Sequence, residues 1–451
     1  MQRSWLFLLL LTGWRSAPEA QAQVVINEVC PKNATVLAEA PDHFPDWIEL
    51  HNPGPIAVDL TGLRLSIDPE DPSGWSLPSG TLAPGGFLLL FEGDDNSDGH
   101  HFDFKLAREG AHLVLRNADL LPLSTLTVPY LRADHSFGLA TATGSAYFPT
   151  PTPGAPNSTE GYAGYTTAPQ FGRSPGFHAQ GLAVNILSGP GTSVRFTTDG
   201  SEPGLDAQPY TGPVGIGGNT TLKAKAFQEG YIPSTTTVGT YFVGENSALP
   251  VVSLSVHPDS LFHPVLGLYM PGPGASPDYP YHGANFWTER GIAVHFEYFD
   301  EHGARRVQQE LELRIHGGSA SRTKPQRPFR LTARDVYGDD RIRHAFFPDR
   351  PEHEVFKRII LRNAGGDWCL AHYRDAFFHQ VALHEGLDLD GLGFRSVLVF
   401  INGEYRGIHE IRERIDEDHL ALTQGADPDS VLIMEEENGS IQGDTMHFHN
   451  L

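Results

Sequence analysis

The sequence predicts a multidomain protein made mainly of β structure. Its 451 residues are enough for about three domains of roughly 150 residues each. The 48 glycines and 35 prolines, set against 39% hydrophobic residues, favour short strands joined by turns over long helices. With only two cysteines, Cys30 and Cys369, the domains must be stabilised by buried apolar cores and not by a framework of disulfides.

Residues 1–22 have the features of a secretory signal peptide. Arg3 precedes an apolar run from Trp5 to Leu11, and small residues form a cleavage-site pattern that ends at Ala22. The run is shorter than the roughly 20 apolar residues that a transmembrane anchor needs. We therefore expect a mature protein that is secreted or extracytoplasmic, at the cell envelope or surface, without a transmembrane anchor.

The charge of the chain argues against several partners. It has 55 acidic and 32 basic residues, which give a formal net charge of −23. Such a charge repels nucleic acid phosphates and anionic membranes. We therefore expect no nucleic-acid partner, and any anion site must be a local cluster of basic side chains.

Residues 23–159 form the first predicted domain. Short β-type runs such as VVINEV, DWIELHNPG and GGFLLLFEG are separated by turn signals, a spacing typical of a β-sandwich. The motifs INEV, DWIELHNPGPIAVDLTGLRLS, LAPGGFLLLFEG, FDFKLAREGAHLVL and PTPGAPN resemble the lamin-tail domain of exported bacterial proteins. The resemblance implies an immunoglobulin-like sandwich that serves as a binding or spacing module, with a surface polymer as one partner class.

Residues 168–244 form the second predicted domain. The motifs FTTDGSEP, YTGPV, TTLKAKAFQEGYIPS and TYF resemble, in order, the chitobiase C-terminal-like module. The resemblance implies another small sandwich, which accompanies catalytic domains without doing catalysis. Sugar hydrolysis needs a pair of acidic residues beside a sugar subsite, and the sequence supplies no such pair. A carbohydrate-active accessory protein is therefore the least favoured function.

Stretches rich in Pro, Gly and Ser separate the predicted domains. TPTPGAPNSTEGYAG follows the first domain and VGENSALP follows the second. Such composition is typical of domain boundaries. We therefore expect each of the first two domains to fold without the third.

Residues 249–451 carry the candidate chemistry. Strands are expected at LPVVSLSV, AVHFEYFDEHG and QELELRIHGG, and the cationic stretch GGSASRTKPQRPFRLTAR follows. A Gly- and Ser-rich loop that leads into cations can cradle phosphate through its N–H groups and charged side chains. On a strand edge, the same cations only discourage sheet extension. The candidate cofactor-binding residues are Arg314, Arg322, Lys324, Arg327 and Arg330.

A helix and a hairpin follow the cationic stretch. AHYRDAFFHQVALHEG has apolar residues near helical spacing, and the predicted helix places Asp375 at the positive end of its dipole. Asn402 and Gly403 form a strong hairpin signal, because both central residues of a type I′ turn need positive φ. The return strand carries Glu410 and Glu413, which either pair with neighbouring arginines or point into a cleft.

Five motifs of this region resemble, in order, the CotH family of atypical kinases: LRIHGGSASRTKPQRPFRLTARDVYG, LRNAGGDW, YRDAFFHQ, VFINGEYRGIHEIRERIDEDHL and GDTMHF. The resemblance implies an α+β fold similar in outline to protein kinases, with ATP held between two lobes and Mg²⁺ beside it. It also implies a secreted or surface protein as substrate. On this basis the candidate catalytic residues are Asp375, Glu410 and Glu413, and no metal ligand is assigned.

Two departures from the family pattern bear on activity. Arg327 stands where relatives commonly have Lys, and a planar guanidinium is not equivalent to a compact ammonium group. The acids that follow the hairpin, in IDEDHL and DPDSVLIMEEENG, are interpreted as helix-flanking and turn residues and not as a metal-binding motif. The full prediction is two immunoglobulin-like β-sandwiches followed by an incomplete α+β atypical protein-kinase-like domain with weak or no activity. An ATP-dependent kinase of secreted or surface proteins and a noncatalytic surface or matrix protein both stay open as functions.

Overall fold

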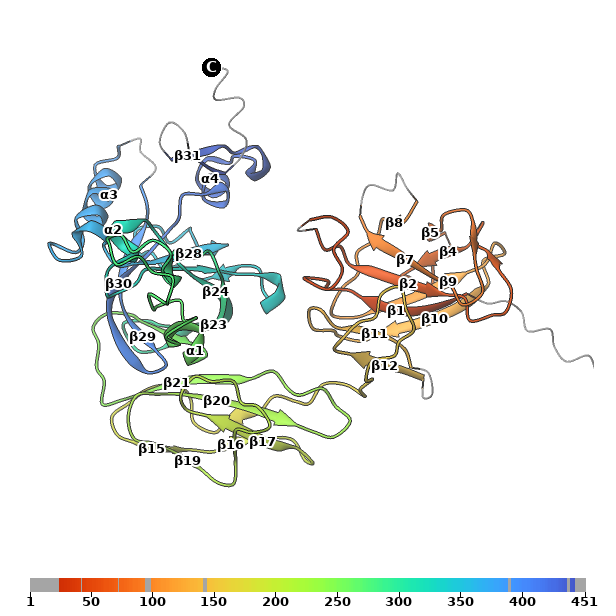
Figure 1. Cartoon of the computed structure of the whole chain (residues 1–451), viewed down its shortest axis with the longest axis horizontal. Helices are drawn as coiled ribbons and strands as arrows, with labels where there is room; N and C mark the ends of the chain where they lie inside the picture. Colours follow the sequence, from red (N-terminus) through yellow and green to blue (C-terminus); the bar gives the residue numbers. More distant parts are fainter. Residues whose placement is uncertain are drawn as a thin grey trace, which may run out of the picture. The chain divides into compact units, whose positions relative to one another are not determined.

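A computed structural model of the chain describes residues 24–41, 43–71, 73–93, 99–140, 144–387, 391–435 and 439–442 (Figure 1). The predicted signal peptide lies outside these residues. The chain is multidomain and mainly β, which confirms the predicted fold class. It divides into two compact units, residues 1–162 and residues 163–451, each with its own core.

The first unit is a sandwich of two sheets. A six-stranded sheet has the order β12-β11-β1-β2-β7-β8, and a four-stranded sheet has the order β10-β9-β4-β5. All neighbours pair antiparallel except β7 and β8, and β3 and β6 form a small sheet of their own. The strands are β1 (Val25–Cys30), β2 (Trp47–His51), β3 (Val58–Asp59), β4 (Arg64–Ser66), β5 (Trp75–Ser76), β6 (Thr81–Leu82), β7 (Phe87–Glu92), β8 (His101–Phe102), β9 (Ala111–Arg116), β10 (Pro122–Val128), β11 (Ser136–Ala140) and β12 (Gly144–Phe148).

Apolar side chains from both sheets fill the space between them. Ile26 and Ile48 of the larger sheet and Leu65 and Leu113 of the smaller one are fully buried in one cluster. Alternate residues of each strand face the partner sheet, so the alternating runs in the sequence become the core. Each such side chain contributes about 1.5–3 kcal/mol to folding.

Two buried carboxylates fasten the segment that follows β12. Glu49 accepts a hydrogen bond from Asn27 Nδ2 at 2.7 Å and another from the backbone N–H of Gly154. Glu28 accepts from the backbone N–H of Thr152 at 3.2 Å. Burial raises the pKa of Glu49 to about 7. The PTPGAPN motif is thus tied to β1 and β2 through its backbone.

The second unit begins with a small β-sandwich. A five-stranded sheet has the order β14-β21-β20-β17-β18, and the pairs β13-β16 and β15-β19 form two short sheets. Val184 and Ile216 of the short sheets pack with Phe196 and Leu222 of the large one. The strands are β13 (Gln170–Phe171), β14 (Gly176–His178), β15 (Leu182–Val184), β16 (Ile186–Leu187), β17 (Ser193–Thr197), β18 (Gln208–Pro209), β19 (Val214–Ile216), β20 (Thr220–Phe227) and β21 (Thr237–Val243).

The rest of the second unit is built on a closed barrel with the strand order β22-β23-β24-β25-β28-β30-β29. β22 runs parallel to β29 and closes the barrel, while the other neighbours are antiparallel. Phe296, Leu313, Leu331, Ile359 and Val397 are buried in its core. The strands are β22 (Val251–Ser255), β23 (Ile292–Phe299), β24 (Arg305–Ile315), β25 (Phe329–Thr332), β28 (Arg358–Arg362), β29 (Phe394–Ile401) and β30 (Glu404–Arg412), with the outlying pairs β26 (Ile342–Arg343) and β27 (Val355–Phe356), and β31 (Ile433–Glu435) and β32 (Gly439–Gln442).

The predicted hairpin joins β29 to β30. Asn402 and Gly403 at its tip have φ of 51° and 83°, the positive values that the sequence signal requires. The side chain of Asn402 also accepts from the N–H of Val256 and donates to its carbonyl, both at 2.9 Å. The tip is therefore fixed to the end of β22.

Helices occupy a small part of the second unit. α3 lies within the predicted helical segment, and α4 begins at an N-cap, Asp416, that accepts from the N–H of His419. Figure 1 shows α3 and α4 at the end of the barrel opposite the small sandwich. The helices are α1 (Pro258–Phe262), α2 (Ser319–Arg322), α3 (Arg374–His384) and α4 (Glu417–Gln424), with 3₁₀ turns η1 (Asn285–Trp287), η2 (Asp335–Tyr337), η3 (Gly365–Asp367) and η4 (Pro428–Ser430).

The small sandwich and the barrel share a buried core. Phe242 of β21 is fully buried, and its ring centroid lies 5.6 Å from that of Phe299 and 4.9 Å from that of Phe400, both in barrel strands. The fully buried Glu297 accepts from the N–H of Thr240 at 2.9 Å. The independent folding expected for residues 168–244 stays a prediction, and this shared packing provides the place to test it.

Candidate anion-binding site

Four neighbouring strands place arginines on the outer face of the barrel. The register pairs Arg314 with Arg330, Arg330 with Ile360 and Ile360 with Arg412. Residues paired in this way point to the same side of a sheet, while successive residues point to opposite sides. Leu313, next to Arg314, is accordingly buried in the core. The guanidinium groups of β24, β25 and β30 therefore project toward one outer surface.

A pocket of about 210 Å³ lies on this surface, where α3 approaches β28 and β30. We call it the arginine pocket. Basic groups dominate one part of its lining, and aliphatic side chains form another part, a combination that suits an organic anion. The lining residues are His316, Ile360, Arg362, Asp375, His379, Leu392, Arg412, Glu413, Arg414 and Ile415.

Basic side chains gather at the pocket although the whole chain is strongly acidic. Burial, with Arg414 and Arg330 nearby, lowers the pKa of His316 to about 3. Burial also lowers the pKa of Arg330 to about 10, with smaller contributions from Arg414 and Arg314. Burial is the main cause of both shifts, and the neighbouring arginines add to it. This is the local basic cluster that an anion site in an acidic chain requires.

Two of the predicted catalytic carboxylates lie among these arginines. Asp375 Oδ2 lies 3.0 Å from Arg412 Nη1 and 3.3 Å from Arg362 Nη2. Glu410 Oε2 lies 3.3 Å from the same Arg412 nitrogen. Burial raises the pKa of Glu410, and Arg412 opposes that shift. The carboxylates orient the guanidinium groups and offset part of their charge.

Several buried polar atoms of this cluster have no hydrogen-bond partner among the described residues. They are the Nε atoms of Arg330, Arg362 and Arg412 and the Oε1 atom of Glu410. A buried donor without an acceptor costs about 1–3 kcal/mol, so such groups are normally satisfied. An anion that accepts from the three guanidinium groups removes this cost.

Arg327 has a different environment from the one expected. Its side chain is buried, and it donates to the carbonyls of Tyr269, at 3.2 and 3.3 Å, Arg322 and Lys324. Its guanidinium lies 3.9 Å from the ring centroid of Phe286. The guanidinium group of Arg327 is thus engaged by carbonyl oxygens and by an aromatic ring. Its predicted contact with phosphate stays a prediction.

Arg322 and Lys324 also have local partners. Arg322 donates to the carbonyl of Phe286 at 2.9 Å and to Glu289 at 2.8 Å, and Lys324 Nζ lies 6.0 Å from the ring centroid of Trp368. Arg314 pairs with Glu312 at 2.6 Å. Of the predicted cofactor-binding residues, Arg314 and Arg330 thus lie on the arginine-bearing face, whereas Arg322, Lys324 and Arg327 brace the turn between β24 and β25.

Glu413 holds the barrel to the segments that flank it. Its Oε2 atom accepts from Arg350 Nη1 at 3.0 Å and from the N–H of Gly393 at 2.7 Å. Its Oε1 atom lies 2.7 Å from His353 Nδ1. Both oxygens of this buried carboxylate have partners. Its predicted catalytic role stays a prediction, and these contacts assign it a structural role.

Three central residues of the arginine pocket were not selected from the sequence. They are Arg362, Arg412 and Arg414. The signal for them was present, because Arg362 and Arg412 each follow a buried apolar residue, Leu361 or Ile411, and so belong to the outer face of their strands. The motif similarity points to the turn that precedes β25.

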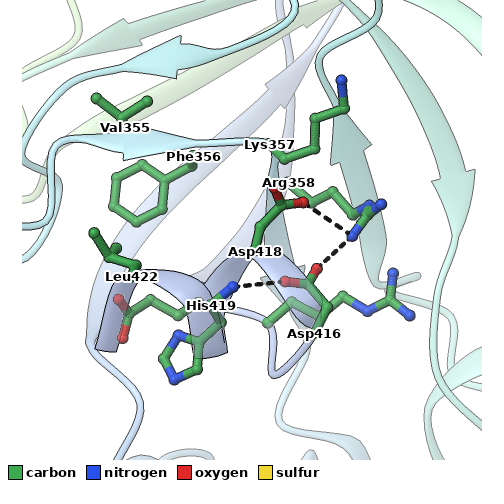
Figure 2. Close-up of a pocket in the computed structure, with 10 residues that line it drawn as sticks. Val355, Phe356, Lys357, Arg358, Asp416, Asp418, His419 and Leu422 are labelled. Carbon is green, nitrogen blue, oxygen red and sulfur yellow. Dashed lines mark hydrogen bonds and ion pairs between the residues drawn. The ribbon is translucent and has the colours of Figure 1, made fainter. Parts of the chain in front are cut away.

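Arg358 connects the barrel to the segment that begins α4. Its Nη1 lies 2.7 Å from Asp416 Oδ2 and 3.5 Å from Asp418 Oδ2, and its Nη2 lies 2.9 Å from Glu417 Oε1. Figure 2 shows this contact beside the N-cap bond from His419 to Asp416. These acids therefore serve to position α4 next to the arginine pocket.

A partly buried chain of hydrogen bonds supports the turn before β25. Trp368 Nε1 donates to Gln326 Oε1 at 3.0 Å, and Gln326 Nε2 lies 3.0 Å from His409 Nδ1. His409 Nε2 lies 3.0 Å from the carbonyl of Arg327. The carbonyl can only accept, so His409 donates from Nε2 and accepts at Nδ1. Burial lowers the pKa of His409 to about 4 and keeps it neutral.

This histidine is expected to make the second unit sensitive to acid. The unfolded chain protonates His409 near pH 6.5, whereas the folded chain does so near pH 4, so the contribution is complete above pH 6.5 and is lost as the pH falls toward 4. The loss is on the order of 3 kcal/mol. His316 acts in the same direction, and the raised pKa of Glu410 partly opposes both.

Urea unfolding between pH 4 and 7 tests this expectation. His409→Gln should flatten the pH dependence in that interval, while His302→Gln, at an exposed turn, should leave it unchanged. An equal slope in the His409→Gln variant and the parent chain would show that the ring is not buried and neutral.

Two further features concern the described part of the chain, namely a metal site and a membrane span. Within it, no three His, Cys, Asp or Glu side chains lie close enough together to hold a metal ion. Nor does any of its helices combine the length and the hydropathy that crossing a bilayer requires.

The architecture defines a modular β protein in which two sandwiches precede a barrel domain with a cationic pocket on its outer face. Family models match the chain in the predicted order. Residues 17–128 match the Lamin Tail Domain, residues 174–239 the Chitobiase/beta-hexosaminidase C-terminal domain, and residues 313–447 the CotH kinase protein family. The three resemblances are confirmed, and the CotH similarity covers residues 313–447 of the predicted third domain. No curated protein matches the chain.

Proposed function

We propose that the barrel domain binds a nucleoside triphosphate, ATP by family resemblance, with its phosphates in the arginine pocket. The observation that carries the proposal is the pair of buried, unpartnered Nε groups of Arg362 and Arg412 in the pocket lining, with a third such group, that of Arg330, on the neighbouring strand β25. Three guanidinium groups that converge on one surface suit the oxygens of a polyphosphate. The match to the CotH kinase protein family supports the same ligand.

Different residues of the lining are assigned to different parts of the nucleotide. Arg362, Arg412 and Arg414 neutralise phosphate charge, and Asp375 holds two of these side chains in place. The aliphatic residues Ile360, Leu392 and Ile415 provide an apolar wall for the less polar part of the nucleotide. ATP, with Mg²⁺, supplies the phosphoryl group that a kinase transfers.

The ion pairs of Asp375 and Glu410 with Arg412 favour nucleotide binding over phosphate transfer. Asp375 and Glu410 each direct one oxygen atom at Arg412, and these contacts assign them to orienting that guanidinium group. We infer an exported CotH-type protein with weak or no transferase activity, whose substrate, if phosphate is transferred, is a secreted or surface protein. Export rests on residues 1–22, and sequencing the N-terminus of exported protein tests it, since a chain that retains Met1 contradicts cleavage.

Titration calorimetry with ATP and with adenosine tests the nucleotide site. Arg412→Gln is expected to weaken ATP binding about 10-fold or more, because a charge-assisted hydrogen bond contributes about 1.5–3 kcal/mol. Adenosine binding should change less. Arg414→Gln, at a half-buried position, provides a second variant that is less prone to disturb folding.

Arg406→Gln is the matched control. Arg406 lies on the same strand, β30, but pairs with Glu404 and lies over the ring of Phe262. Equal losses of affinity in all three variants, or ATP affinity unchanged in Arg412→Gln and Arg414→Gln, would place the nucleotide elsewhere. ATP binding without phosphate transfer to protein would select the noncatalytic alternative.

A further inference from the structure

A second pocket lies beside the arginine pocket, where the segment leading into α3 meets the outer face of β29 and β30. Its volume is about 570 Å³. The register pairs Ser396 with Glu410 and Leu398 with Ile408, so the pocket follows these two strands toward the hairpin. We call it the Glu410 pocket. It is lined by His372, Tyr373, Phe394, Tyr405, Ile408 and Glu410, together with Ser396.

The mouth of the Glu410 pocket is aromatic and open to solvent. Tyr373 is 56% exposed, Tyr405 is 55% exposed and Ile408 is 41% exposed. Exposed apolar groups gathered in one place mark an interaction site more often than single ones do. Aromatic rings present a negative π face, which attracts cations.

At the base of the pocket, one carboxylate oxygen of Glu410 has no hydrogen-bond donor among the described residues. Glu410 is 2% exposed, and its Oε2 atom is bound to Arg412. Its Oε1 atom is buried and has no hydrogen-bond partner in the described structure. Arg412 also donates to Asp375 at 3.0 Å, so its charge is shared between two carboxylates. The acceptor capacity of Glu410 is therefore only half used.

These features define the group that fits. It must donate a hydrogen bond or carry a positive charge at its tip to reach Glu410, and it must have an apolar stem that passes between the rings. An anion is repelled by the carboxylate, and a purely apolar group leaves Oε1 unsatisfied. Lysine and arginine side chains have both properties.

We propose that the Glu410 pocket binds a lysine or arginine side chain presented by a partner polypeptide. The formal charge of −23 favours the approach of a basic partner. Docking of the cation also stabilises the ionised form of Glu410, whose pKa is raised by burial. The inference goes beyond nucleotide binding and does not rest on it.

Saturation-transfer NMR on the full chain tests the proposal without nucleotide. The probes are Nα-acetyl-lysine amide and its norleucine counterpart, which has the same apolar stem without the charge. The lysine probe is expected to bind about 10-fold more tightly, the ratio for one hydrogen bond to a charged group. Glu410→Gln should abolish the preference.

Two tyrosine variants separate this pocket from the rest of the surface. Tyr405→Ala should weaken the lysine probe and leave ATP binding unchanged, and Tyr279→Ala, at another exposed tyrosine, should change neither. The proposal is overturned by equal binding of the two probes, by a lysine preference that survives in Glu410→Gln, or by the absence of saturable binding at millimolar concentration. A failure of ATP binding alone leaves it standing.

Discussion

Replacing Phe242 with alanine is expected to lower the free energy of unfolding of the whole second unit by about 3–5 kcal/mol, the usual cost of removing a fully buried phenylalanine ring. Phe242 belongs to the small sandwich by sequence, but its ring packs on Phe299 and Phe400 of the barrel. The substitution therefore leaves a cavity between the two domains. Urea unfolding of the full chain, followed by tryptophan fluorescence and circular dichroism, measures the effect.

The coupling between these domains has a matched control. Leu187→Ala removes an apolar side chain of the same sandwich at a position 57% exposed, and it should change stability by less than about 0.5 kcal/mol. A shared core predicts that residues 163–451 unfold in one transition, which Phe242→Ala shifts as a whole. Separate transitions, with only the sandwich affected, would restore the independent folding that the linker composition suggested.

Arg327→Ala is expected to cost a similar amount, about 3–5 kcal/mol, because several carbonyls lose their donor and each unsatisfied buried group costs about 1–3 kcal/mol. The guanidinium serves the carbonyls of Tyr269, Arg322 and Lys324, and all three lose a charged donor together. The contact with the ring of Phe286 is lost as well. Chemical denaturation measures the loss.

The Arg327→Lys variant tests whether the position needs several hydrogen-bond donors or only a positive charge. Lys keeps the positive charge, but a single ammonium group cannot reach the same set of carbonyls as the planar guanidinium group. We expect it to recover only part of the stability lost in Arg327→Ala. Lys324→Ala, a half-buried neighbour, should cost less than about 1 kcal/mol. Full stability in Arg327→Lys would show that the position needs only a positive charge.

The features of the fold that depend on local sequence were predictable. The turn at Asn402 and Gly403 needs positive φ at both residues, and the Asn-Gly dipeptide alone indicates this requirement. Both residues have positive φ in the structure. The helical segment around Asp375 and the alternating runs of the two sandwiches are similar cases. Family motifs added the order of the domains.

The candidate site depends on long-range contacts that no local pattern specifies. Arg327 and Arg330 are three residues apart, yet the first is enclosed by Tyr269 and Phe286, more than 40 residues earlier in the chain, and the second faces outward from β25. Strand alternation indicates that Arg412 points outward, but only the register shows that Arg330 and Arg362 lie on neighbouring strands of the same face. The shared core around Phe242 could not be predicted either, because its contacts join residues that are far apart in the sequence.

Hydrogen–deuterium exchange of the full chain, with and without Mg²⁺ and ATP, tests most directly the claim that the arginine pocket holds the nucleotide. Slower exchange is predicted in residues 358–362 and 410–415, the two segments that supply most of the pocket's charged lining, and no change is predicted in the first unit. Exchange that is unaltered in both segments at saturating ATP, or slowed only around Tyr405 and Ile408, would contradict the account.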